Sequence, residues 1–320
     1  MTTAVTITNN TAVATAGNFD QNLVADWLAF NAYKSPATVL TYKKTLKNFF
    51  AFLGANKIAS PTRQDIISYR NQLCATKSVS TARLHIAVVK NFFKWAASCG
   101  LCLDVAAGVK SPSLAEEGEI HSREPLTLSQ ARTVLSTFKN KTDEKSLRDS
   151  LILRLMLTCG LRSIEIVRLD STDIEKRHGK IFLRVWGKGR SGKTARVEIP
   201  ASVHKMILDY LNVRGARFKV GEPLFVSTSN RTRGQRLQTQ TISRLAKATF
   251  RGVGIDTPTI TCHSCRHTCA TILLREGQTD IRRVQKLLRH KSVVTTERYA
   301  ADLRQANDDT VAVIDGLLAA

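Results

Sequence analysis

Apolar residues recur every three or four positions through residues 20–105, with polar residues between them. This spacing predicts amphipathic helices. Ser35-Pro36 and the pair Thr62 and Asp65 are typical helix starts, and Ser80 opens a third helix. Residues 20–108 are therefore predicted to form a helical domain, preceded by a disordered tail over residues 1–19. The apolar positions are Val39, Leu40, Leu46, Phe49, Phe50 and Leu53; Ile66, Ile67, Tyr69 and Leu73; and Leu84, Val88, Val89, Phe92, Phe93 and Trp95.

Residues 109–125 carry no apolar period. They contain prolines, serines, a glycine and the acidic cluster Glu116, Glu117 and Glu119. This composition is typical of a linker, so a second domain is predicted over residues 126–320.

The second domain combines helical and strand patterns. Thr127 and Gln130 have the spacing of a capping box, and an apolar helix over 151–158 is ended by Gly160. Further helices are predicted over 203–211, 241–250 and 264–276, and after a cap at Thr279. Residues 181–186 and 195–199 have strand composition, and the C-terminal segment 311–318 is apolar. The prediction is a mainly α fold with a small β-sheet: a helical domain followed by an α+β domain.

The two predicted strands are joined by GKGRSGKT, residues 187–194. Its glycines and three cations suit a hairpin tip that approaches a backbone phosphate. A nucleotide-binding P-loop is rejected because the required first glycine is missing and no helix follows the Gly-Lys-Thr.

The net charge is +22 and the pI is near 10.1, which indicates a protein that attracts a polyanion. Nucleic acid is the leading candidate. An acidic membrane surface is disfavoured, because the basic residues are spread along the chain and no apolar run reaches about 18 residues. No secretory signal is present, so a cytoplasmic protein is expected.

Seven cysteines, an odd number, favour a reduced protein over a disulfide framework. Two CxxC pairs, Cys99–Cys102 and Cys262–Cys265, raise the question of zinc, since His263 and His267 are close to the second pair. Both pairs fall at predicted helix ends, so buried free thiols are the favoured interpretation, and no metal or cofactor is expected.

Candidate chemistry concentrates in two places. Arg162 follows a predicted tight turn at a helix N-terminus, which favours anions, and Glu165 is placed to orient its guanidinium. Residues 262–300 contain His263, Arg266, His290 and Tyr299. A tyrosine hydroxyl can attack a phosphodiester if cations and hydrogen-bond donors stabilise the charge that develops on the phosphate.

Four segments in this order resemble the tyrosine recombinases, the phage-integrase and Xer-like superfamily: TCGLRSIEIVRL (158–169), VWGKGR (185–190), HSCRHTCAT (263–271) and LLRHKSVVTTERYA (287–300). The resemblance covers nearly the whole second domain, and residues 20–108 resemble the helical core-binding domain of the family. Two positions depart from the common pattern: Arg289 stands where many members have glycine, and Cys265 where leucine is usual.

The resemblance implies roles for individual residues. Arg162 and Arg266 would bind the scissile phosphate, with Glu165 in a supporting position, and Tyr299 would form a 3′-phosphotyrosyl bond. Lys188 would protonate the leaving 5′ oxygen, with Lys193 as the competing lysine, and His263 and His290 would assist through hydrogen bonding and proton transfer.

The function implied is site-specific DNA recombination without a cofactor, by a two-domain integrase, a transposon-borne recombinase or resolvase, or a Xer-like enzyme. The expected partners are double-stranded DNA carrying a recombination site and further copies of this chain, as a tetramer on paired sites that exchange C-terminal segments. The enzyme would be associated with the nucleoid when bound to DNA. A DNA-binding regulator without catalysis, using residues 279–299 as a helix-turn-helix, and a type IB topoisomerase remain alternatives.

Overall fold

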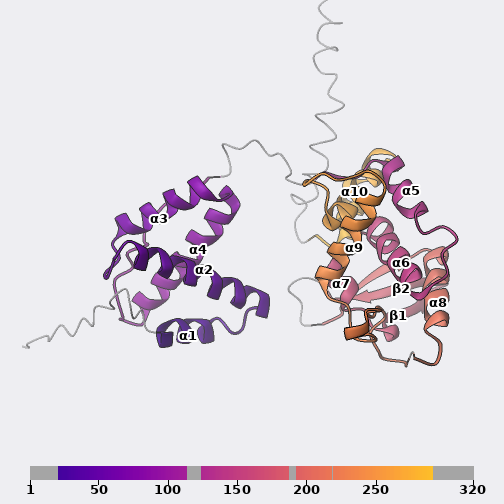
Figure 1. The fold of residues 1–320 in the computed structure, drawn as a ribbon, viewed down its shortest axis with the longest axis horizontal. Helices are drawn as coiled ribbons and strands as arrows, with labels where there is room; N and C mark the ends of the chain where they lie inside the picture. Colours follow the sequence, from indigo (N-terminus) through magenta and orange to yellow (C-terminus); the bar gives the residue numbers. More distant parts are fainter. Residues whose placement is uncertain (1–20, 114–123, 187–191, 218, 291–320) are drawn as a thin grey trace, which may run out of the picture. The chain divides into compact units, whose positions relative to one another are not determined.

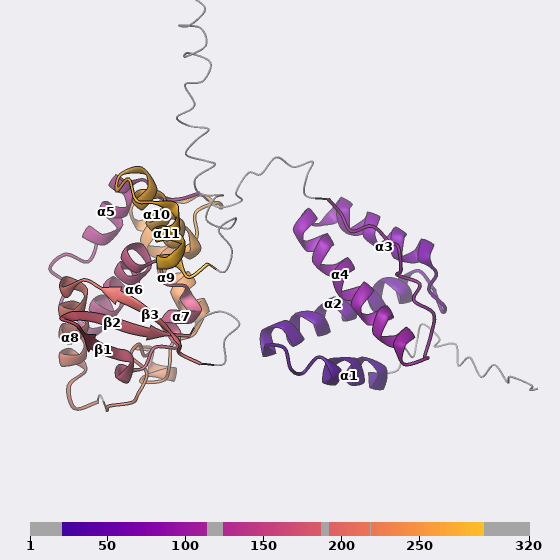
Figure 2. The same ribbon diagram turned by 180° about the vertical axis from the view of Figure 1, so that it is seen from behind.

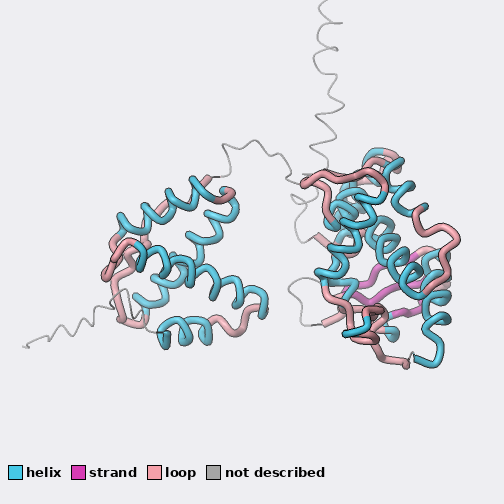
Figure 3. Tube along the Cα trace, in the orientation of Figure 1, coloured by secondary structure: helices cyan, strands magenta, loops and turns pink. Residues whose placement is uncertain are grey.

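The computed structural model describes residues 21–113, 124–186, 192–217 and 219–290. The chain divides into two compact units, Met1–Ile120 and His121–Ala320, and each is described by itself (Figure 1). The described part of the first unit contains helices joined by loops and no strand, whereas the second contains helices and a small sheet, so the predicted mainly α fold is confirmed (Figure 3). The predicted tail over 1–19 and the apolar segment 311–318 lie outside the described residues.

Helices α1 (Gln21–Phe30), α2 (Pro36–Ala55), α3 (Arg63–Thr76) and α4 (Val79–Ser98) form the first unit. The predicted starts of α2 and α3 are confirmed: Ser35 caps α2 with proline in its first turn, and Thr62 and Asp65 form a capping box. The start of α4 is a correction. Ser78, not Ser80, caps it, because the Ser78 hydroxyl accepts the backbone N–H of Thr81. The aromatic core includes Trp27, Phe49, Tyr69, Phe92 and Phe93.

Helix α6 (Glu144–Cys159) is the centre of the second unit. It packs against α5 (Leu128–Ser136), α8 (Ala201–Arg214), α9 (Thr239–Gly252) and α10 (Cys262–Arg275). Its C-terminal half is buried on nearly every side, which explains the unbroken apolar run in the sequence. The short helices α7 (Ser163–Val167) and α11 (Ile281–Leu288) follow α6 and α10, and α11 lies beside α10 (Figure 2).

The sheet has three antiparallel strands in the order β1 (Ile174–Arg177), β2 (Lys180–Val185) and β3 (Ala195–Ile199). The two strands predicted from sequence correspond to β2 and β3, and Val185 pairs with Ala195 where their connection begins. Sequence reasoning missed β1, which is short and mostly charged. It is joined to β2 by His178-Gly179, both with positive φ as a two-residue hairpin turn requires.

Two helix starts differ from the prediction. Asp280, not Thr279, caps α11, because its carboxylate accepts the backbone N–H groups of Arg282 and Arg283. Helix α6 begins at Glu144 rather than near Leu151, since its first turns are polar and carry no apolar period. In the described part of the chain, 3-10 turns at Ser171–Asp173, Gly215–Arg217 and Asn230–Thr232 connect the larger elements. None of the helices within the described ranges combines the length and apolar character needed to cross a bilayer.

Candidate active site

Gly160 makes the turn that presents Arg162. It ends α6 in the left-handed region, with φ 58° and ψ 32°. A Cβ atom at this position would lie 2.5 Å from Cδ2 of Leu288, so both the backbone conformation and the space call for glycine. Two residues later Arg162 is extended, with φ −80° and ψ 152°, and α7 begins after it. The tight turn predicted beside a helix N-terminus is present.

Glu165 holds the Arg162 side chain. Nη1 of Arg162 donates to Oε1 of Glu165 at 2.9 Å, and the backbone N–H of Arg162 donates to Oε2 at 2.8 Å. The Glu165 side chain is 1% exposed and that of Arg162 is 18% exposed. A buried carboxylate therefore orients a guanidinium that still reaches solvent, as the sequence spacing indicated.

Arg266 lies deeper, on the first turns of α10. The residue is 2% exposed. Its guanidinium donates to the carbonyl of Gly160 through Nη1 and to the carbonyl of Leu288 through Nη2. One side chain thus connects α10, the turn after α6 and the end of α11. His263 precedes Arg266 by three residues on the same helix, and its backbone N–H donates to the Thr261 hydroxyl.

His290 lies close to both arginines. It follows α11, and its backbone is held by hydrogen bonds with Gln285 at 3.2 Å and 3.3 Å. Burial lowers the pKa of His290, and the charges of Arg266, Arg162 and Arg289 lower it further, to about 4. The imidazole is therefore neutral near pH 7 and able to accept a proton. The structure brings Arg162, Arg266 and His290 together around the end of α6.

A second basic residue shares Glu165. Nη2 of Arg289 donates to Oε2 of Glu165 at 2.7 Å, and Nε donates to Oε1 at 3.4 Å. In the sequence Arg289 stood out only because the resemblance led us to expect glycine there. Its contact with a residue 124 positions earlier has no local sequence signal.

Tyr299 and Lys188 lie outside the described residues. Lys193, the competing lysine of the β2–β3 connection, is described. Its ammonium contacts Asp170 at 2.5 Å and also Asp173. Burial alone would raise the pKa of Asp170, but its hydrogen bonds with Lys193 and Arg236 hold that pKa below the ordinary value. Lys193 therefore takes part in an ion-pair network at the base of the hairpin.

The cysteines divide in a way the sequence did not predict. Cys265 is buried as expected, and burial raises the pKa of its thiol well above the ordinary range. Cys262 is half-buried. The expectation of buried thiols is wrong for Cys99 and Cys102, which are exposed in the non-helical stretch that follows the end of α4 at Ser98. Within the described ranges, no group of three His, Cys, Asp or Glu side chains is arranged to hold a metal ion.

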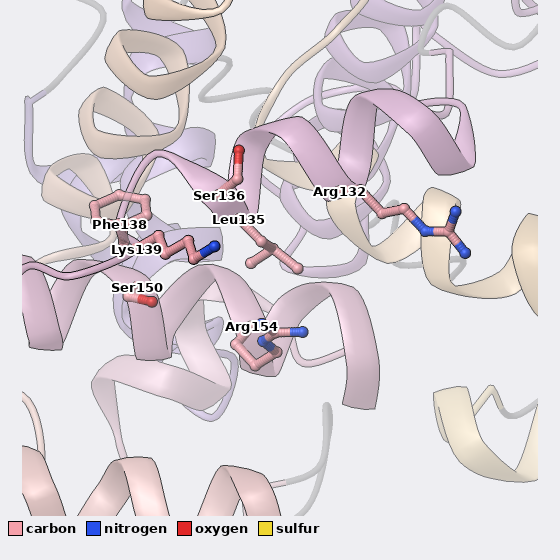
Figure 4. Close-up of a pocket in the computed structure, with 7 residues that line it drawn as sticks. All are labelled: Arg132, Leu135, Ser136, Phe138, Lys139, Ser150 and Arg154. Atoms are coloured by element: carbon pink, nitrogen blue, oxygen red, sulfur yellow. The ribbon is translucent and has the colours of Figure 1, made fainter.

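A separate pocket of about 410 Å³ lies between α5 and α6 (Figure 4). Its basic lining residues are Arg132, Lys139 and Arg154, and Nε of Arg154 is buried without a hydrogen-bond partner among the described residues. None of the motif residues lines this pocket. The candidate site is therefore defined by the side-chain cluster around Gly160.

The pKa of His290 predicts a stability difference in acid. Between pH 6.5 and about 4 the unfolded chain protonates this histidine while the folded chain keeps it neutral, so stability falls as pH decreases through this range. Because the imidazole is only half-buried, the effect is expected to be about 1–2 kcal/mol.

Differential scanning calorimetry of the full chain and of His290→Gln between about pH 7 and pH 4.5 tests this, because all other titrating groups cancel in the comparison. The variant should lose less stability than the wild type as pH falls. Parallel curves would contradict the lowered pKa.

Sequence comparisons place the chain among known proteins. The profile of the Phage integrase family matches residues 124–306, and that of the Phage integrase N-terminal SAM-like domain matches residues 26–100. Tyrosine recombinase XerC of Corynebacterium glutamicum is 34% identical over 224 residues, which cover 70% of this chain and 68% of that protein. Tyrosine recombinase XerC of Mycobacterium tuberculosis is 32% identical over 285 residues, 86% of this chain and 91% of that protein.

Solved structures share the fold. XerH site-specific recombinase bound to palindromic difH substrate matches with a TM-score of 0.70 at 15% identity, over 95% of this chain and 91% of that chain. A lambda integrase(75-356) dimer bound to a COC′ core site matches with a TM-score of 0.65 at 17% identity, over 86% of this chain and 96% of that chain. At these identities the likeness concerns the fold alone.

Proposed function

This chain belongs to the phage integrase family, and from that premise we propose that it is a site-specific DNA recombinase that cleaves and rejoins strands through a 3′-phosphotyrosyl intermediate. The observation that carries the proposal is the cluster formed by Arg162, Glu165, Arg266 and His290 around the turn at Gly160. In this cluster two guanidinium groups lie close to a neutral imidazole, and the chain that carries it belongs to the family.

The arginines are proposed to bind the two non-bridging oxygens of the scissile phosphate. Negative charge on these oxygens grows as a pentacoordinate phosphorane forms, and guanidinium groups fixed beforehand stabilise that charge without reorganisation. Glu165 supports this role because its hydrogen bonds fix the fork of Arg162. Arg266 is fixed in turn by two backbone carbonyls.

Tyr299 is the proposed nucleophile. The chain has five tyrosines. Tyr33, Tyr42 and Tyr69 belong to the helical first unit, and Tyr210 in the second unit is fully buried, with a pKa raised by burial. Tyr299 is the only tyrosine in the four motif segments of the sequence, and it shares the segment 287–300 with the site residue His290. In cleavage its oxygen bonds to phosphorus while the bond from phosphorus to the 5′ oxygen breaks.

The histidines are proposed to assist proton transfer. A neutral His290 can accept the proton that the tyrosine hydroxyl loses, and a bound phosphate would offset the arginine charges that lower the pKa of His290. His263 is proposed to donate a hydrogen bond to the phosphate from the first turn of α10.

Lys188 is proposed to protonate the leaving 5′ oxygen. The position of Lys193 supports this choice over the alternative, because its ammonium is engaged with Asp170 and Asp173. An ammonium that already donates to two carboxylates is not free to donate to the leaving oxygen. Lys193 is better suited to anchoring the hairpin.

Leaving-group rescue distinguishes the two lysines. Lys188→Ala is expected to slow cleavage of ordinary DNA by about 10²–10⁴-fold, because the 5′ oxygen leaves without a proton. DNA with a 5′-bridging sulfur at the scissile position should restore most of this rate, since a thiolate leaves without protonation.

Lys193→Ala is the matched control. It should lower stability by about 1–3 kcal/mol, because Asp173 is buried and loses its closest cation. Its ratio of rates on the two substrates should remain that of the wild type. If sulfur substitution rescues Lys193→Ala instead, the assignment of the two lysines is reversed.

The proposed partners are double-stranded DNA with a recombination site and three further copies of this chain. The charge of +22 supports DNA binding. Solved relatives include a lambda integrase tetramer bound to a Holliday junction, which supports a tetrameric assembly here. Recombination would occur in the cytoplasm, at the nucleoid. The C-terminal segment is proposed to be exchanged between protomers.

The proposal is tested by covalent capture. The full chain is incubated with nicked fragments of its own genome without magnesium, and DNA that remains attached to protein in SDS is recovered and sequenced. A recombinase should enrich one short sequence. A regulator would bind DNA in a gel shift without giving attached DNA, and a topoisomerase would relax a supercoiled plasmid and attach without enrichment. Either result would overturn the proposal.

A further inference from the structure

Arg289 occupies a backbone position that suits glycine. It directly follows α11, with φ 57° and ψ 39°, in the left-handed region. Glycine adopts this conformation freely, whereas a residue with a side chain does so at a conformational cost. An arginine in this conformation indicates that contacts of its side chain offset the conformational cost of the backbone.

The Arg289 side chain turns back into the candidate site and is 11% exposed. Nη2 donates to Oε2 of Glu165 at 2.7 Å and to the carbonyl of Gly160 at 3.3 Å. Nη1 donates to the carbonyl of Leu287 at 2.6 Å. The guanidinium therefore bridges α7, the turn after α6 and the end of its own helix.

Both acceptors are shared with the arginines proposed to bind phosphate. Glu165 accepts from Arg162 and Arg289 on both of its oxygens, and the Gly160 carbonyl accepts from Arg266 and Arg289. With two guanidiniums fixing one carboxylate, Glu165 has little freedom to rotate, and the orientation of Arg162 is restricted with it.

Charge supports the same role. Burial would raise the pKa of Glu165, but the charge of Arg289, followed by its hydrogen bond and then those of Arg162, holds that pKa below the ordinary value. Glu165 thus stays ionised although it is almost fully buried. The groups around this pair are Arg162 directly before α7, Arg266 on α10, His290 after α11, and the buried thiols Cys159 and Cys269.

We propose that Arg289 is a positioning residue for strand cleavage, which fixes the Glu165 carboxylate so that the Arg162 guanidinium is held in one orientation toward the scissile phosphate. This inference rests on the proposed recombinase function. Arg289 would thus help to orient Arg162 through Glu165. Removal of the Arg289 guanidinium alone should therefore slow cleavage.

Arg289→Gly is the informative variant, because it removes the guanidinium while suiting the left-handed backbone. In a single-turnover assay of covalent adduct formation at saturating protein, it should react about 10–100-fold more slowly than the wild type. Arg289→Lys keeps the positive charge but loses the planar guanidinium, and its rate of adduct formation should lie between those of the wild type and Arg289→Gly. Arg282→Ala removes an exposed arginine from α11, the helix that Arg289 follows, and should react at the wild-type rate.

The pH profile separates positioning from simple packing. Without Arg289 the largest charge that lowers the pKa of Glu165 is gone, and one that lowers the pKa of His290 is gone too. Both pKa values should rise, so the acid limb of the rate profile should move to higher pH. The Glu165 carboxyl is also titrated directly by ¹³C NMR, assigned with Glu165→Gln, and its midpoint should move to higher pH in Arg289→Gly.

The outcomes are distinct. If the wild type forms no adduct, the proposed function fails, and the NMR titration still tests the Glu165 contact. An adduct in the wild type with an unchanged rate, profile and titration in Arg289→Gly would overturn this inference alone. Weaker DNA binding with an unchanged rate at saturation would also overturn it, because Arg289 would then be a DNA contact.

Discussion

Tyr299→Phe is expected to form no SDS-resistant adduct with DNA that the wild type attacks. Phenylalanine has nearly the same shape but lacks the oxygen that bonds to phosphorus, so cleavage should fall by on the order of 10³-fold or more, to the limit of detection. DNA binding should persist, because it depends on the net positive charge of the chain and on the arginines proposed to bind phosphate. Denaturing gels and gel shifts on the same DNA measure the two quantities side by side.

Tyr33→Phe is the matched control. Tyr33 belongs to the helical unit and is 78% exposed, so its hydroxyl is accessible to bound DNA. Its variant should give the wild-type yield of adduct. An adduct retained in Tyr299→Phe would mean that another residue attacks the phosphate.

Arg162→Lys is expected to reduce cleavage by about 10²–10³-fold while leaving the fold nearly intact. Lysine keeps one positive charge but cannot donate two parallel hydrogen bonds to a phosphate or hold the same geometry with Glu165. The stability loss should be below about 1 kcal/mol, because Arg289 still pairs with the buried Glu165 carboxylate.

Arg168→Lys provides the comparison for Arg162→Lys. Arg168 ends the same short helix, and its guanidinium lies 5.0 Å from the centre of the Trp186 ring. Its replacement should change the cleavage rate by only a few-fold. If Arg162→Lys cleaves as fast as Arg168→Lys, the guanidinium of Arg162 is not a phosphate ligand.

Local signals in the sequence were enough for much of the site. The capping box of Thr127 and Gln130, the end of α6 at Gly160 and the contact of Arg162 with Glu165 all act within four residues, so spacing alone indicates them. The family resemblance added the order of the motifs, which places α10 and the residue after α11 in the same catalytic unit.

Other features depend on contacts that no local pattern records. Strand β1 is short and charged, and its hydrogen bonds to β2 define it more than its composition does. Arg289 reaches Glu165 only because α7 and the end of α11 meet at the Gly160 turn. The position of Lys193 in the β2–β3 connection is compatible with a catalytic lysine, but its ammonium contacts Asp170 and Asp173, which precede it by about 20 positions.

The most direct test of the account identifies the amino acid that becomes attached to DNA. The covalent complex is digested with nuclease and trypsin, and the nucleotide-bearing peptide is sequenced by mass spectrometry. The account predicts a nucleotide on Tyr299, in the peptide YAADLR of residues 299–304. A nucleotide on any other residue of the chain would contradict the proposed phosphotyrosyl mechanism at this site.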